Sequence, residues 1–418
     1  PAALPENNTA LNSGGVDQFS GSYGMSFELA RIGDPGGQGG LSYSRSFSNL
    51  SWRNNLGGGV YESSTTGRFT VRYGNFTEEF TLTNPSLGTY APWRPTVSTL
   101  EEDVSGGSWG DFTYKAPDGS VIEFSGDLRD ESIGLHAAVT SVTRPDGEVI
   151  TYDGPNVSSS LGYQLRTEDG NSLINSAYKY CDITLDNCSG LPSGNWPSAS
   201  GLTNSAGETY SVTDTAVGNN TQIQVTSPEG VSTTVTLDSN GRVSSRAYAG
   251  NTWTYSSSST STQTQSTVTG PSGISQVSTY NSDGQILSAE TIPSGQTSGL
   301  GVTYTYDTAG LPETVTYPEG NSVVYEFDAL GRVEEIREKA KPSSGVPDRV
   351  VSFTYAACGP TTYKYCSKPI TMTNERGLVT KFNYSSAHGE VTRIEYPRPN
   401  SSADYPIQTF GYVQKYAW

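Results

Sequence analysis

Tyr304-Thr-Tyr-Asp307-Thr-Ala-Gly310 and Tyr325-Glu-Phe-Asp328-Ala-Leu-Gly331-Arg332 are two copies of one short pattern: an aromatic residue, Asp, two spacers and Gly. Two earlier copies have an apolar or aromatic residue at the first position, and the second of them has Asn in place of Asp. The turn residues of the four copies are Asp238 and Gly241, Asn281 and Gly284, Asp307 and Gly310, and Asp328 and Gly331. A pattern repeated in this way predicts a repeated structural unit.

Each copy has the chemistry of a tight turn. Asp or Asn can accept hydrogen bonds from backbone N–H groups two residues on, and Gly adopts the left-handed corner that other residues avoid. In three copies a Pro-x-Gly precedes the pattern, with Gly230, Gly273 and Gly320 each eight residues before the Asp or Asn. Pro presets φ at the first corner of a turn. The residues between, such as 231–237, are rich in Thr, Val and Ser, which suits a strand. We therefore predict successive antiparallel hairpins.

The same residues resemble the tyrosine-aspartate (YD) repeats of RHS proteins, most closely over Tyr304–Leu311 and Tyr325–Val333. Gly40–Asn49 resembles the segment that opens many RHS shells. The chain departs from the family pattern at Asn281, and the Arg is absent after Gly284 and Gly310. The resemblance implies an all-β fold in which YD-repeat antiparallel hairpins form an elongated or coiled β-sheet shell. Such shells occur in secreted bacterial toxins and surface proteins.

The composition also favours a large all-β body. The chain has 418 residues with 47 Gly, 23 Pro and 26 Tyr, and 16% of its residues are charged, which leaves little material for long helices. The net charge of −17 argues against nucleic acids and anionic membranes as partners, because their phosphates would be repelled. No apolar run approaches the length of a membrane span, and no signal peptide is recognisable.

Four cysteines fall in two local pairs, Cys181 with Cys188 and Cys358 with Cys366. Each pair encloses a short loop with turn-forming residues and lacks the spacing or neighbouring His of a zinc site. We therefore favour two structural disulfides, which imply an oxidising compartment and an extracellular or cell-surface location. Free buried thiols in a cytosolic protein remain the alternative.

The predicted organisation has three segments. Residues 1–15 form a flexible arm or a donated strand, residues 16–127 an opening β-domain, and residues 128–418 a YD-repeat β-shell region. A disulfide-stapled insertion at about 156–206 interrupts the shell region. The aromatic end at Trp418 reads as the interior of a strand, which suggests truncation or donation of a strand to a neighbour; a toxin domain after Trp418 would change the functional interpretation.

No motif predicts a catalytic residue, a cofactor or a metal. His136 and His388, the two histidines, have no nucleophile motif beside them. The acidic clusters 78–79 and 101–103 could hold Ca²⁺, but they lack the twelve-residue loop pattern of a calcium site. Several tryptophans could stack on sugars, although core packing is the more common use of aromatic residues; they are Trp52, Trp93, Trp109, Trp196 and Trp253.

We predict a noncatalytic, secreted or cell-surface scaffold with a structural or adhesive role. Unpaired sheet edges favour self-association or the binding of another surface protein. Two alternatives stay open. One is the shell of an RHS toxin that encapsulates or delivers a C-terminal effector, and the other is a carbohydrate-binding surface protein with a glycan as its partner.

Overall fold

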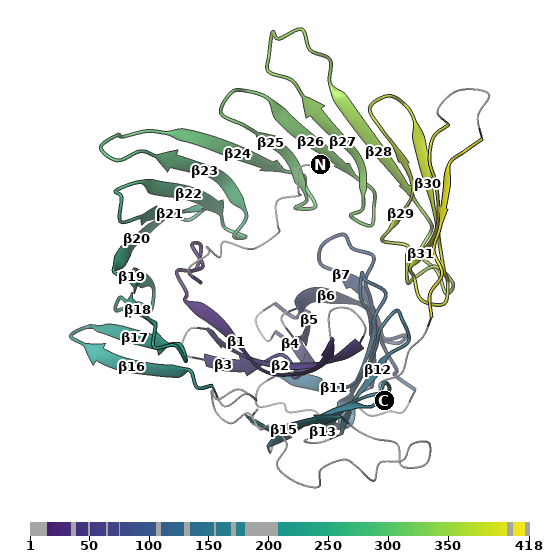
Figure 1. Ribbon diagram of the computed structural model, residues 1–418, viewed down its shortest axis with the longest axis horizontal. Coiled ribbons are helices and arrows are strands. Elements are labelled where there is room, and N and C mark those ends of the chain that lie inside the picture. The colour runs from purple at the N-terminus through teal and green to yellow at the C-terminus, as the bar shows by residue number, and fades with distance from the viewer. Residues whose placement is uncertain are drawn as a thin grey trace.

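The computed structural model describes residues 15–34, 39–48, 51–63, 66–74, 76–105, 110–128, 134–153, 156–168, 173–179, 208–398 and 404–413 (Figure 1). Within these ranges the only helical element is a one-turn 3₁₀ segment, Gly126–Leu128. The strands form three sheets, and every strand pairing in them is antiparallel. The predicted all-β fold built from antiparallel hairpins is confirmed.

The first sheet is a three-stranded antiparallel sheet near the N-terminus. Its strands are β1 (Gly24–Asp34), β2 (Gly39–Ser48) and β3 (Ser51–Asn54). The segment before it, 15–23, makes an isolated bridge between Val16 and Tyr23, both of which are buried.

The second sheet has twelve strands, and β4 to β11 close into a ring because β11 pairs with both β4 and β10. β12 to β15 continue the sheet from β11. The strands are β4 (Gly58–Glu62), β5 (Phe69–Tyr73), β6 (Phe76–Asn84), β7 (Thr89–Pro92), β8 (Thr99–Glu102), β9 (Phe112–Lys115), β10 (Val121–Ser125), β11 (Leu135–Thr143), β12 (Val149–Asp153), β13 (Asn156–Ser159), β14 (Tyr163–Glu168) and β15 (Leu173–Lys179).

The third sheet has seventeen strands in sequence order, and we call it the wall. Its strands are β16 (Ser211–Val217), β17 (Asn220–Thr226), β18 (Ser232–Leu237), β19 (Val243–Tyr248), β20 (Asn251–Ser259), β21 (Gln263–Thr269), β22 (Ser275–Asn281), β23 (Ile286–Ile292), β24 (Leu300–Tyr306), β25 (Pro312–Thr316), β26 (Ser322–Phe327), β27 (Val333–Lys339), β28 (Arg349–Tyr355), β29 (Pro369–Thr373), β30 (Val379–Tyr384), β31 (Val391–Glu395) and β32 (Ile407–Thr409). The wall curves around the ring and the N-terminal sheet (Figure 1).

The boundaries between the three sheets differ from the predicted segment boundaries. The predicted boundary at 127 falls inside the ring, because β11 follows it and closes the ring against β4 and β10. The described part of the predicted insertion, 156–168 and 173–179, continues the second sheet as β13 to β15. Cys181, Cys188 and the remainder of that insertion lie outside the described residues, as do residues 1–14 of the predicted segment 1–15.

The main core joins all three sheets. Val60, Phe80 and Tyr114 fill the ring and have no exposed surface. The same cluster of buried side chains includes Leu41 of the N-terminal sheet and Val235 of the wall. The first strands of the wall are therefore anchored to the ring and the N-terminal sheet by apolar packing, and the later strands extend beyond this core.

Candidate functional site

The YD turns all have the same hydrogen bonds. At Asp328 the backbone N–H donates to the Arg332 carbonyl, and Gly331 N–H donates to the Asp328 carbonyl. The carboxylate Oδ1 accepts from Leu330 N and Arg332 N, both at 2.9 Å. The Gly has a positive φ, +72° at Gly331. Asp238 with Gly241, Asn281 with Gly284, and Asp307 with Gly310 repeat this arrangement. All eight predicted turn residues therefore lie in chain reversals.

A fifth turn of this kind was not predicted from the sequence. Asn374 Oδ1 accepts from Arg376 N and Leu378 N, and Gly377 has φ of +73°. The segment has Thr373 where the other copies have an apolar or aromatic residue, so the pattern as we defined it excluded it. Asn-x-x-Gly alone would have found this turn.

Tyrosines at the ends of wall strands, among them Tyr306 of a YD turn, link neighbouring hairpins by hydrogen bonds. Tyr306 Oη donates to the carbonyl of Ile286 at 2.8 Å, and Tyr355 Oη donates to the carbonyl of Val333 at 2.8 Å. Tyr384 makes the same kind of bond to Pro369, at 2.9 Å. In each pair the tyrosine is the last residue of its strand, and the acceptor is the first residue of the preceding strand in the wall. Sequence reasoning gave tyrosine a packing role and missed this hydrogen bond.

The YD turns also form the edge of the wall that contacts the rest of the molecule. A Cβ atom at Gly284 would lie 3.2 Å from the ring of Phe19, and one at Gly331 would lie 2.5 Å from the carbonyl oxygen of Pro95. Arg242, after the first YD turn, donates from Nη2 to the carbonyl of Phe19 at 2.9 Å. Glycine is required at these turns both for the positive φ and for the close approach of another chain segment.

The face of the wall that points toward the ring is continuous across the sheet. Tyr255 on β20 packs against the main core, and it pairs across the sheet with Val268. Directly opposite residues project from the same face. Further along, Ser266 pairs with Ser278, Ser278 with Ala289, and Ala289 with Val302. The core-facing side therefore continues to β24 and the strands after it, and we call it the inner face.

From β24 to β31 the inner face is aromatic and aliphatic. Its members are Val302, Tyr304, Tyr306, Val315, Tyr317, Val323, Tyr325, Phe327, Ile336, Val351, Phe353, Tyr355, Met372, Phe382, Tyr384 and Ile394. Val315, Val323 and Tyr325 are buried in a cluster separate from the main core, and most of the others are half-buried. Burial raises the pKa of Tyr306 and of Tyr384 to about 12. These two phenols therefore stay neutral at physiological pH.

The opposite face of the same strands is polar. It presents hydroxyl groups and ion pairs, such as the bond between Thr354 and Thr371 at 2.6 Å and the pair Arg337–Glu335 at 2.6 Å. β24 shows the alternation within one strand, since Val302 and Tyr304 lie on the inner face and Thr303 and Thr305 on the outer face. The wall thus has a polar outer face and a largely apolar inner face.

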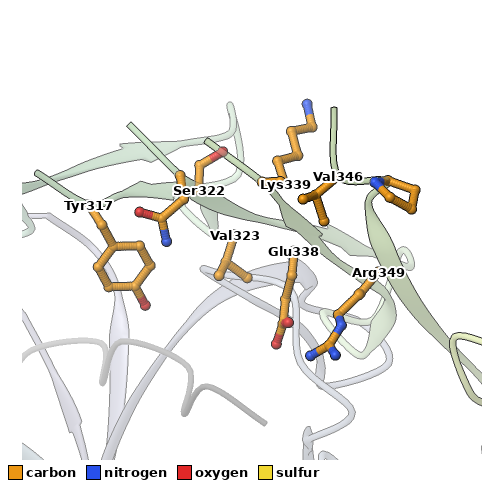
Figure 2. A pocket seen from close by; sticks show the side chains of 10 residues that line it. Tyr317, Ser322, Val323, Glu338, Lys339, Val346 and Arg349 are labelled. Carbon is orange, nitrogen blue, oxygen red and sulfur yellow. The ribbon is translucent and has the colours of Figure 1, made fainter. Parts of the chain in front are cut away.

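A pocket of about 380 Å³ opens where β25 to β28 reach the edge opposite the YD turns. Figure 2 shows Tyr317, Val323, Glu338 and Arg349 on the side of the sheet that faces the ring, and Lys339 on the other side. Glu338 and Arg349 occupy opposite positions of β27 and β28. They place two side chains of opposite charge at the border of the largely apolar lining.

A second pocket, of about 540 Å³, lies between the ring and two YD turns. Its lining includes Trp93 and Arg94 from the ring, and Asp283, Asp307 and Tyr306 from the wall. Trp93 is 53% exposed, and the Arg68 guanidinium covers its ring at 3.3 Å. Trp253 lies on the wall near Arg246, at 5.2 Å. The side chain of Trp52, and all of Trp109 and Trp196, lie outside the described part of the chain.

The remaining candidate residues have structural contacts. Cys358 and Cys366 form a disulfide. His136 pairs with Glu62 at 3.0 Å, and His388 lies against the ring of Tyr412. The acidic residue Glu78 accepts a hydrogen bond from Tyr114 at 2.6 Å. The described residues include no group of three or more His, Cys, Asp and Glu arranged to hold a metal ion.

The repeat is also found by comparison with known families. A model of the RHS repeat matches residues 280–322, which run from the tyrosine before the Asn281 turn to the start of β26. The chain contains an RHS repeat. A search of curated protein sequences finds no match to it. No helix in the described residues is long and apolar enough to span a bilayer.

Two solved structures are similar to this RHS-repeat protein. One is TcdB2–TccC3 without its hypervariable C-terminal region, with 11% identity, a TM-score of 0.35, and coverage of 89% of this chain and 22% of that chain. The other is the pore of the Photorhabdus luminescens Tc holotoxin with a mutated TccC3, with 11% identity, a TM-score of 0.33, and coverage of 94% and 22%. The RHS-repeat protein thus spans about a fifth of the length of these chains.

Proposed function

We propose that this RHS-repeat protein is part of a noncatalytic shell, and that the inner face of its wall lines a space that holds an unfolded polypeptide. The observation that carries the proposal is the division of the wall into an apolar inner face and a polar outer face. The RHS repeat supports it, since the family resemblance implies a coiled shell of the kind found in secreted toxins. This function corresponds to the first alternative from the sequence, and it replaces the adhesive scaffold as the leading hypothesis.

The apolar surface of the inner face favours an unfolded polypeptide as the molecule that the space holds. Exposed apolar surface costs about 25 cal/mol per Å² in water, so a lining of this extent favours contact with another apolar surface. An unfolded chain offers apolar side chains along its whole length, whereas a folded domain has buried most of its own. The half-buried side chains between β24 and β31 can therefore hold an unfolded segment with little dependence on its sequence.

The polar outer face and the net charge of −17 suit contact with water and with other protein subunits. The disulfide between Cys358 and Cys366 supports assembly in an oxidising compartment and hence secretion. We propose an extracellular, toxin-like assembly with further protein subunits as the setting of the shell.

The experiment measures the binding of a permanently unfolded, fluorescently labelled polypeptide by fluorescence anisotropy. The test variant, Tyr304→Glu with Val351→Glu, places two charges on the inner face, and its affinity for the polypeptide should fall at least about tenfold, because each buried charge costs several kcal/mol. The matched control, Thr303→Glu with Ser352→Glu, places two charges on the outer face of the same strands and should bind as the unmodified protein does.

Thermal unfolding of both variants shows whether each is folded at the temperature of the binding measurement. The proposal fails if the folded unmodified protein binds no unfolded polypeptide. It also fails if the inner and outer pairs of charges weaken binding equally.

A further inference from the structure

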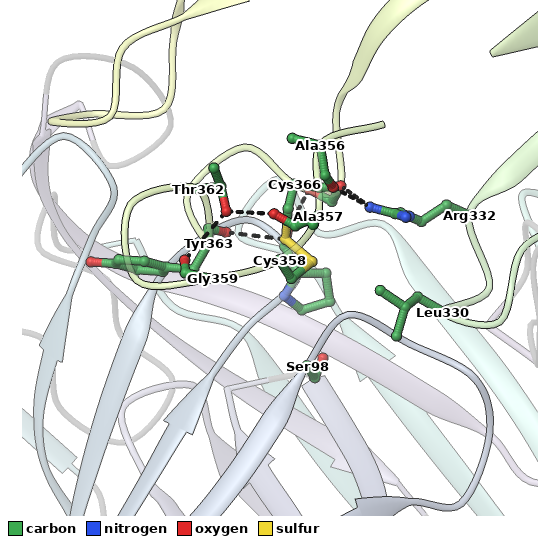
Figure 3. Close-up of a disulfide and its surroundings, with 12 residues drawn as sticks. Ser98, Leu330, Arg332, Ala356, Ala357, Cys358, Gly359, Thr362, Tyr363 and Cys366 are labelled. Carbon is green, nitrogen blue, oxygen red and sulfur yellow. Dashed lines mark hydrogen bonds between the residues drawn. A yellow bond between two sulfur atoms is a disulfide. The ribbon is translucent and has the colours of Figure 1, made fainter. Parts of the chain in front are cut away.

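The loop between β28 and β29, residues 356–368, contacts both the wall and the ring, and we call it the clasp loop. It contains the disulfide between Cys358 and Cys366 (Figure 3). Its contacts on the ring are two Pro-Asp-Gly turns, 117–119 and 145–147, which belong to the β9–β10 and β11–β12 hairpins.

Polar contacts hold the clasp loop on the ring. Ser367 Oγ donates to the carbonyl of Pro117 at 2.6 Å, and Lys364 Nζ donates to the carbonyl of Pro145 at 3.0 Å. The backbones also approach closely, because a Cβ at Gly119 would lie 2.6 Å from the Cα of Lys364. The loop must therefore keep one conformation for this fit to persist.

Arg332 holds the same loop on the wall. Its Nη1 donates to the carbonyls of Ala356 and Cys366, both at 2.8 Å (Figure 3). Its Nε donates to Asp328 Oδ2 at 2.6 Å. Arg332 therefore links the YD turn at Asp328 to the carbonyl of Cys366, one of the two disulfide-bonded residues. The clasp loop joins this part of the wall to the ring.

Within the loop, the backbone hydrogen bonds are those of short turns, and the disulfide adds a covalent closure to them. Tyr363 N donates to the carbonyl of Gly359 and Cys366 N to the carbonyl of Thr362, which gives short turns with no strand pairing. The disulfide closes a segment of nine residues around these turns. Without this covalent closure the unfolded loop gains conformational entropy, and its contacts with the ring weaken.

We propose that the Cys358–Cys366 disulfide is a redox-sensitive clasp, and that its reduction releases the clasp loop from the ring and frees the adjoining part of the wall. Cys358 is exposed and Cys366 is 2% exposed. A thiolate of a small dithiol attacks Sγ of Cys358, and the Cys366 thiolate leaves and is protonated. The second thiol of the reductant then displaces Cys358, which leaves two cysteine thiols and an oxidised, cyclic reductant. A shell assembled under oxidising conditions would open at this seam in a reducing compartment.

The test is hydrogen exchange of the whole chain with and without dithiothreitol. In the reduced protein the amides of residues 362–368 should exchange about tenfold faster or more, and those of the ring turns at Gly119 and Gly147 should also exchange faster. The amide of Gly241, in a YD turn far along the wall, should not change. The prediction concerns the seam alone and holds whether or not the wall encloses a polypeptide.

Two double variants show which of the two cysteine pairs causes the change in exchange. Cys181→Ser with Cys188→Ser keeps the clasp and should respond to the reductant as the unmodified protein does. Cys358→Ser with Cys366→Ser should exchange rapidly at the seam without reductant and show no further change with it. If that variant does not fold, Ser367→Ala keeps the disulfide and should still raise exchange at Gly119. The proposal is overturned if reduction of Cys358–Cys366, verified by mass spectrometry, leaves exchange at both ring turns unchanged.

Discussion

At the scale of the residue, one side-chain oxygen organises each YD turn. Oδ1 accepts from two backbone N–H groups that would otherwise lack a partner in the turn. The amide oxygen of Asn281 or Asn374 fills the same position, so the departure from Asp at 281 preserves the turn. The negative charge matters only where a cation is near, as at Asp328, which pairs with Arg332.

Asp328→Ala should therefore destabilise the protein more than Asp328→Asn does. Alanine removes two backbone hydrogen bonds and the partner of a mostly buried guanidinium, which costs about 1 to 3 kcal/mol. Asparagine keeps the Oδ1 acceptor and loses only the ion pair. The free energy of unfolding in urea measures both losses. Equal losses would show that Oδ1 does not organise the turn.

Two glycines of these turns allow the cost of a left-handed backbone to be measured apart from the cost of a close contact. Gly241 and Gly331 have φ of +75° and +72°, but a Cβ meets nothing within 4 Å at Gly241 and lies 2.5 Å from Pro95 O at Gly331. Gly241→Ala should cost about 1 to 2 kcal/mol from the left-handed backbone alone. Gly331→Ala should cost more, because the wall must also move from the ring. Urea unfolding of the two variants compares these costs, and the same cost at both positions would contradict the contact with Pro95.

At the scale of the element, turn chemistry is local and could be predicted from the sequence. The four residues from Asp307 to Gly310 supply the side-chain acceptor and the glycine that their turn requires. The strands beside the turn can be predicted from their alternating Thr, Val and Tyr residues. The tyrosine hydrogen bond could not be predicted in the same way. Its acceptor at Ile286 lies twenty residues earlier, and only the sheet register brings the two together.

Ionisation of the inner-face tyrosines should weaken folding at alkaline pH. Burial raises the pKa of Tyr306 from 10.0 to about 12, so the unfolded chain loses this proton at a lower pH than the folded protein does. The contribution of this phenol to stability is fully present below about pH 10, and it is lost as the pH rises from about 10 to 12. Tyr306→Phe cannot ionise, so its urea midpoint should fall less steeply between pH 9.5 and 11.5 than that of the unmodified protein. Parallel slopes in the two proteins would count against a shifted pKa.

At the scale of the whole molecule, the arrangement of the sheets could not be predicted from the sequence, because it depends on contacts between residues far apart in the chain. The predicted boundary at 127 followed the repeat pattern, whereas the ring closes through pairing of Gly59 with Ala138, which no local motif specifies. The inner face could be inferred from alternation within each strand. Which face lies toward the ring, and the role of the clasp loop on Pro117 and Pro145, required the assembled structure.

The wall is tied to the rest of the molecule at a second place, by the segment 15–23 before the first sheet. Gly21 accepts a hydrogen bond from Val243 N at 2.8 Å, and Phe19 lies against Tyr280, with ring centroids 5.7 Å apart. Tyr280 is 3% exposed. This contact joins the N-terminal segment to two consecutive YD turns, far along the wall from the clasp loop.

Phe19→Ala should loosen this attachment and leave the clasp seam intact. Removing the ring uncovers Tyr280 and leaves a cavity beside Gly284, which costs about 3 to 5 kcal/mol for a well-buried aromatic and less here because Phe19 is half-buried. Hydrogen exchange should accelerate at the Asn281 turn and stay unchanged at Gly119. Phe19→Leu, which keeps most of the apolar contact, should show a smaller effect at the same turn. Acceleration of both seams together would mean that the wall detaches as one cooperative unit, and that the two attachments do not act independently.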